Sequence, residues 1–185
     1  MKRFIALLMA LTLCFALCAC KKNKEAEAPA PTNALCTQQE LLTLIEQNAD
    51  CYYFFYVSPL EHTDQQNSDG YMGVAEGPFD NYETLRNLVL STYTKSCAET
   101  LLSYPSADAP LYKEAGGGFF VNPEVKGNPD YNLTWNNVSV EITNSTQTEC
   151  SFKTTTTSDD YTTVYTTSGK AVYEDGKWRL AQLIY

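Results

Sequence analysis

The sequence predicts an α+β fold in which N-terminal helices pack on a C-terminal antiparallel β-meander. Two helix-start patterns occur early in the domain, at Thr37-Gln38-Gln39-Glu40 and at Asp80-Asn81-Tyr82-Glu83. From Leu111 onward, apolar residues alternate as they do in strands, and Asp175-Gly176 is a strong hairpin signal. Helices followed by strands predict the α+β class, with a cystatin-like curved sheet as the alternative.

Residues 1–19 are predicted to form a signal peptide. Lys2 and Arg3 precede the apolar run 4–16, which is shorter than the roughly 20 residues of a membrane-spanning helix. Leu17-Cys18-Ala19-Cys20 resembles the bacterial lipobox, with Cys20 as the lipidated first residue of the mature chain. The two chains of a diacylglycerol suffice for stable membrane residence. We therefore expect an anchor on the extracytoplasmic face of the cell membrane; an ordinary signal with a chance cysteine is the alternative.

A tether over residues 20–36 and a single domain over residues 37–185 are predicted to follow. The tether has two prolines and few bulky apolar residues, so it cannot bury enough surface to fold. The stretch from Cys36 to Tyr185 contains eight Lys and Arg and 20 Asp and Glu, a net charge of −12. This charge excludes nucleic acid and favours a basic protein as partner, although it is also typical of a surface that keeps an exported domain soluble.

Three helices are expected in the first half of the domain. The first should run from Gln38 to about Tyr56, because apolar side chains recur there at helical spacing. A second should begin at the Asp80 capping pattern, and Thr94 should cap a third from Lys95 to about Ser103. Residues 58–79 contain three glycines and two prolines without periodicity, which predicts a long loop.

The second half is expected to be a meander of strands. Residues 111–121 predict a hairpin that turns at Gly116-Gly117-Gly118, where positive φ is available. Alternating segments follow at 138–142, 149–155, 161–167, 170–174 and 177–185.

The expected loop carries the candidate partner-binding residues. Its acidic side chains could enter a basic cleft on another protein; the residues are Glu61, His62, Asp64, Asp69 and Glu76. Near-adjacent ligands on an irregular loop do not ensure the convergence that a metal site needs. We expect neither a metal nor a cofactor.

Four cysteines of the domain, Cys36, Cys51, Cys97 and Cys150, are candidates for two disulfides if the protein is exported. Four cysteines allow three connectivities. Cys36 with Cys51 is disfavoured, because positions 15 residues apart along one helix are separated by about 22 Å. Reduced, buried thiols are the alternative in an organism that lives without oxygen.

No catalytic residues are predicted. A cysteine hydrolase would have to use His62, and nothing supplies the third, orienting group. Asp159-Asp160 is typical of a turn, where two adjacent carboxylates do not face each other across a cleft. A glycan-binding face of threonines with Tyr161, Tyr165 and Tyr173 is the alternative to protein binding.

Several stretches resemble the IseA-type DL-endopeptidase inhibitor family of bacterial envelope proteins. They are the aromatic-ended first helix and the segments Phe79–Leu102, Leu111–Val121 and Val172–Leu180. The resemblance implies an acidic non-enzyme that blocks cell-wall peptidases by occupying their substrate cleft. The lipid anchor, the domain cysteines and the Thr-rich strands depart from the pattern of that family. We therefore expect an anchored protein that binds a basic envelope protein, with a cell-wall hydrolase as the implied target and a glycan or small ligand as the alternative.

Overall fold

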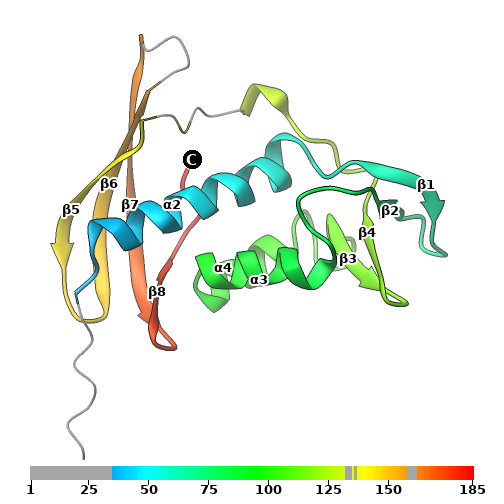
Figure 1. The fold of residues 1–185 in the computed structure, drawn as a ribbon, viewed down its shortest axis with the longest axis horizontal. Coiled ribbons are helices and arrows are strands. Elements are labelled where there is room, and N and C mark those ends of the chain that lie inside the picture. Colours follow the sequence, from blue (N-terminus) through cyan, green and yellow to red (C-terminus); the bar gives the residue numbers. More distant parts are fainter. Residues whose placement is uncertain (1–34, 132–134, 136, 158–161) are drawn as a thin grey trace, which may run out of the picture. The chain divides into compact units, whose positions relative to one another are not determined.

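The computed structural model describes residues 35–131, 135, 137–157 and 162–185, which belong to one compact unit, Asn33–Tyr185. Within these residues, three α-helices and two four-stranded antiparallel sheets confirm the α+β class (Figure 1). The predicted signal peptide, the lipobox with Cys20 and nearly all of the tether lie outside the described residues. So do Asp159, Asp160 and Tyr161.

Helix α2 (Gln38–Tyr52) begins at the predicted capping box. The Glu40 amide donates to Thr37 Oγ1 at 3.2 Å, and the Thr37 amide donates to the Glu40 carboxylate at 2.9 Å. The helix continues as a five-residue π-helix, η1 (Tyr53–Val57), because the Ser58 amide bonds to the Tyr53 carbonyl, five residues back. The helical segment thus ends one residue beyond the predicted end.

The prediction of a long loop between the first two helices was wrong. This segment forms the antiparallel pair β1 (His62–Gln66) and β2 (Met72–Val74). The Asn67 side chain closes the turn between them, since its oxygen accepts from the amides of Asp69 and Tyr71. Every residue of β1 is exposed, which explains why its sequence has no apolar alternation.

The predicted glycine hairpin is confirmed as β3 (Tyr112–Ala115) and β4 (Gly118–Val121), with Gly116 and Gly117 at positive φ. It does not join the strands that follow it, which form the predicted antiparallel meander by themselves. Instead β4 pairs with β2, and the first sheet has the order β1-β2-β4-β3.

Helices α3 (Tyr82–Thr92) and α4 (Lys95–Leu102) lie close to their predicted positions. The N-cap of α3 is Asn81 and not Asp80, because the Asn81 side chain accepts from the Thr84 amide at 2.9 Å. Helix α4 follows Thr94 as predicted, but the Thr94 side chain makes no capping bond. Its first amide, Lys95 N, donates instead to the Glu174 carboxylate at 2.9 Å.

After a short 3-10 turn, η2 (Pro129–Tyr131), the second sheet has the order β5-β6-β7-β8. The predicted strands 161–167 and 170–174 are a single strand, and the last strand ends at Leu180. Asp175 and Gly176, at φ 50° and 82°, form the predicted turn. The strand bounds are β5 (Ser139–Ser145), β6 (Glu149–Thr157), β7 (Val164–Glu174) and β8 (Lys177–Leu180).

The core joins both sheets to the helices. Helix α2 packs against β5 and β8, and α3 contacts α2, β3, β4 and β8. The largest fully buried side chains include Phe55 of η1, Tyr93 after α3, Tyr112 of β3 and Phe152 of β6. In the described part of the chain, no helix has both the length and the apolar character needed to cross a membrane.

Candidate functional site

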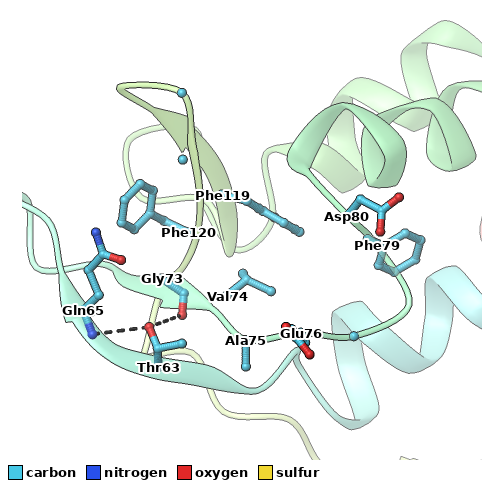
Figure 2. A pocket seen from close by; sticks show the side chains of 13 residues that line it. Thr63, Gln65, Gly73, Val74, Ala75, Glu76, Phe79, Asp80, Phe119 and Phe120 are labelled. Carbon is cyan, nitrogen blue, oxygen red and sulfur yellow. Dashed lines mark hydrogen bonds between the residues drawn. The ribbon is translucent and has the colours of Figure 1, made fainter.

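An open groove of about 660 Å³ lies beside the first sheet. Strands β1 and β2, the segment that leads into α3, and the β3–β4 turn all contribute to it (Figure 2). Its lining consists of small, aromatic and acidic residues: Thr63, Gln65, Gly73, Val74, Ala75, Glu76, Gly77, Phe79, Asp80, Gly117, Gly118, Phe119 and Phe120.

Two half-buried aromatic rings in the groove, those of Phe79 and Phe119, pack against other aromatic side chains. Phe79 packs edge-to-face on Phe54 of η1, with ring centroids 5.3 Å apart. Phe119 lies between Tyr82 of α3 and Tyr112 of β3, each at 5.9 Å. Aromatic side chains fixed in this way lose little conformational freedom when a ligand covers them.

Backbone and small side chains form much of the remaining lining. At Gly73, an added Cβ would lie 3.1 Å from Thr63 Oγ1, which donates to the Gly73 carbonyl and accepts from the Gln65 amide. Gly117 has φ +79°, a conformation that favours glycine. A side chain at position 73 would narrow the groove, and a side chain at position 117 would strain the backbone.

The charge of the groove is negative. Glu76 and Asp80 are both exposed, and none of the described residues that line the groove is basic. Carboxylates beside aromatic faces bind a guanidinium or ammonium group through charge-assisted hydrogen bonds and cation–π contact. The arrangement therefore suits a Lys or Arg side chain presented by another molecule.

The five predicted partner-binding residues do not form one cluster. Glu76 lines the groove, whereas Glu61, His62 and Asp64 lie at the start of β1 or within it, exposed at the edge of the sheet. Asp69 occupies the β1–β2 turn, where it already has a cationic partner.

That partner is Lys113 of β3, whose Nζ lies 2.6 Å from the Asp69 carboxylate and 3.8 Å from the centroid of the Tyr71 ring. The hydrogen bond and the charge of Lys113 lower the pKa of Asp69 from its ordinary value. Asp69 is thus occupied within the protein.

Sequence reasoning missed most of the groove. Asp80 was expected only as a helix cap, Phe79 had no assigned role, and Phe119 was expected only as part of a hairpin. The segment Glu76-Gly77-Pro78-Phe79-Asp80 is itself a signal, since two acids flank an aromatic residue after a strand. Nothing in the sequence shows that β4 pairs with β2 and so brings Phe119 to this segment.

The Thr-rich strands provide less of a ligand platform than expected. Thr156 lies opposite Tyr165, whereas Thr155 lies opposite Thr166 on the other face of the sheet. Tyr173 packs on Trp178 with centroids 5.4 Å apart, and Tyr161 lies outside the described residues. Of the three predicted tyrosines, Tyr165 is thus the one seen exposed, at 49%.

The four cysteines of the domain are free thiols in the structure. Cys36, Cys51 and Cys150 are buried, and burial raises the pKa of Cys51 to about 12. Among the described residues, no group of three or more His, Cys, Asp or Glu is arranged to hold a metal ion.

The resemblance to the IseA-type inhibitors stays a prediction after comparison with protein families and curated proteins. No protein-family model matches the chain, and no curated protein matches its sequence.

Proposed function

We propose that this protein is a lipid-anchored, extracytoplasmic binding protein whose groove receives a basic segment of an envelope protein, with cell-wall peptidases as the target class. The observation that carries the proposal is the composition of the groove: Glu76 and Asp80 are exposed beside the fixed rings of Phe79 and Phe119, with no basic residue among the described lining. Binding there would block the basic segment of the partner without any chemical step.

Long-range electrostatics support the same partner. The −12 charge from Cys36 to Tyr185 steers a basic surface toward the protein and accelerates its association. Glu61 and Asp64, exposed at the β1 edge, extend the negative surface beyond the groove. Because these charges are exposed, added salt should weaken the binding, since at an ionic strength of about 0.1–0.15 M it screens exposed charges that lie more than about 8–10 Å apart.

The described lining of the groove contains no Ser, Cys, His or Lys, and Thr63 Oγ1 is already bonded to backbone groups on both sides. A nucleophile next to a base is what covalent hydrolysis would require. The described lining lacks a Ser, Cys or Lys nucleophile and a His base, which supports a role in binding for the carboxylates that it does contain, Glu76 and Asp80.

The test is a binding titration against basic cell-wall peptidases, together with a peptidoglycan-hydrolysis assay. The double variant Glu76→Gln/Asp80→Asn should weaken binding by about tenfold or more, since two charge-assisted contacts are removed. The matched control, Asp108→Asn/Glu141→Gln, changes the net charge equally at exposed sites that do not line the groove. It should stay within about twofold of the unmodified protein.

Two results would contradict this proposal. Undiminished hydrolysis at high excess of the protein, without binding, would exclude the inhibitor. Equal weakening in both double variants would show that net charge, rather than the groove, attracts the partner.

The anchor is tested separately by fractionation of cells that express the full chain. We expect the protein in the membrane fraction, and Cys20→Ala should release it, whereas Cys18→Ala should not. A Cys20→Ala variant that stays with the membrane would contradict lipid anchoring at this residue.

A further inference from the structure

Two of the four domain cysteines lie in the region where the first helix packs on the second sheet. Cys36 immediately precedes Thr37, the N-cap of α2, and Cys150 lies near the start of β6. Their exposed fractions are 4% and 0%, and both belong to the same hydrophobic core. Burial, and after it the nearby Cys150 thiol, raise the pKa of the Cys36 thiol.

Neighbouring contacts hold the two backbones in this position. The Gln38 side chain donates to the Val140 carbonyl of β5 at 3.1 Å, which fixes the start of α2 against the sheet. Strand β5 is paired with β6 through Cys150 itself, which lies opposite Ser145. The Cys36 thiol itself makes only a long contact, 3.8 Å, to the Thr37 carbonyl. These contacts place the start of α2, and with it Cys36, against the sheet to which Cys150 belongs.

The remaining two cysteines lie elsewhere. Cys51 is on α2 and is fully buried. Cys97 is in the first turn of α4, half-buried. Among the possible partners of Cys36, the packing favours Cys150, and a second disulfide is not part of this pairing.

We propose that Cys36 and Cys150 are a disulfide-forming pair that ties the start of α2 to strand β6, while Cys51 remains a thiol. The oxidant is a disulfide donor R–S–S–R. The thiolate of one cysteine attacks the donor and releases one RSH; the second thiolate then attacks the mixed disulfide and releases the second RSH. Two protons and two electrons leave the cysteine pair, and both end up on the two RSH molecules.

The bond forms during folding, before both sulfur atoms are buried, and it is then protected from reductants. The bond closes a covalent loop between positions 36 and 150. It thus links two segments that are far apart along the chain. In the cell, formation of this disulfide rests on the extracytoplasmic location given in the proposed function, because disulfides persist in oxidising compartments. It does not depend on what the groove binds.

The experiment is peptide mapping of the full-length protein, refolded in a buffer of reduced and oxidised glutathione and then alkylated. Combined cleavage after Lys, Arg and Glu places the four cysteines on separate peptides: Ala28–Glu40, Gln47–Glu61, Ser96–Glu99 and Cys150–Lys153. We expect the first and last peptides to be disulfide-linked and Cys51 to be alkylated after unfolding. Because this test uses a redox buffer, its failure is distinguishable from a failure of membrane anchoring or of groove binding.

Variants provide the controls. Cys36→Ser should make Cys150 available for alkylation after unfolding, and Cys150→Ser should do the same for Cys36, whereas Cys97→Ser should leave the link intact. In the unmodified protein, a reductant should lower the urea midpoint of unfolding, and it should have no such effect on the double variant Cys36→Ser/Cys150→Ser. Alkylation of both Cys36 and Cys150 in the refolded unmodified protein, or a link from either one to Cys51 or Cys97, would overturn the proposal.

Discussion

The side chain of Asn48 pairs with both backbone polar groups of Ile184. Asn48 Nδ2 donates to the Ile184 carbonyl at 2.8 Å, and the Ile184 amide donates to Asn48 Oδ1 at 2.9 Å. The same oxygen accepts from the Tyr93 hydroxyl at 2.9 Å. Asn48 is fully buried on α2. Its side-chain amide therefore connects the C-terminal segment after β8 to the first helix through hydrogen bonds.

Replacing Asn48 by Ala should lower the free energy of unfolding by about 3 kcal/mol. The buried polar groups of Ile184 and Tyr93 lose their hydrogen-bond partner, which costs about 1–3 kcal/mol for each group. A water molecule that occupies the space left by the side chain would bond to some of these groups and offset part of the cost. Tyr93→Phe removes one of the three bonds and should cost about 1 kcal/mol. Urea denaturation measures both values. Asn87→Ala, at an exposed position of α3, should stay within about 0.5 kcal/mol. An Asn48→Ala variant as stable as the Asn87→Ala control would contradict a structural role for this amide.

Gly127 is predicted to tolerate no side chain, because a Cβ there would run into the carbonyl of Val57 and into Pro59 Cδ. Next to it, the Asn128 amide donates to the Tyr56 carbonyl of the π-helix at 2.8 Å, so the close approach is part of a backbone contact. Gly127→Ala should destabilise the protein by about 1–3 kcal/mol in a denaturant titration.

Gly77→Ala is the matched control for Gly127. A Cβ at Gly77 has only the Ala75 carbonyl nearby, at 3.8 Å, and the backbone there does not require glycine. Its effect on stability should be within about 0.5 kcal/mol. Equal effects at both positions would show that backbone freedom, and not the contact with Val57, decides the result.

Local signals in the sequence predicted local structure well. The Thr37–Glu40 capping box and the Asp175-Gly176 turn depend on residues a few positions apart, and both are present. Strand β1 could not be found in this way, because a fully exposed edge strand has no apolar side to alternate with a polar one. The division into two sheets depends on β4 pairing with β2, a choice between distant partners that no local pattern encodes.

The candidate site was predictable only in part, for the same reason. Glu76 was identified from its charge within an acidic segment, but Phe119 enters the groove through the β2–β4 pairing. Asp69, identified by the same charge criterion, is held by Lys113 from a strand that lies far along the chain. Charge alone does not distinguish an acid that is presented to a partner from one that is neutralised within the fold.

Glu174 should be more important for stability than its position near a turn suggests. Its carboxylate accepts from the first amide of α4, Lys95 N, at 2.9 Å and from Arg179 Nη1 at 3.2 Å. Glu174→Ala removes both bonds and should cost about 1–2 kcal/mol in thermal or urea unfolding. Glu174→Gln keeps an acceptor and should cost less. Asp175→Asn, at a side chain that is 81% exposed, should be nearly neutral, and a larger loss there than at Glu174 would contradict this assignment.

The Asp69–Lys113 pair leads to a prediction about pH and about binding. Because Lys113 lowers the pKa of Asp69, the contribution of this pair to holding the β1–β2 turn is present above the ordinary aspartate pKa of about 3.9 and is lost as the pH falls through the lowered value. A carboxyl titration by NMR should place Asp69 below the ordinary value, and Lys113→Met should raise it. The same variant should free Asp69 and strengthen binding of a basic partner at neutral pH, whereas Asp69→Asn should change that binding less than Glu76→Gln does. Equal losses for Asp69→Asn and Glu76→Gln would show that the partner displaces Lys113 and contacts the turn directly.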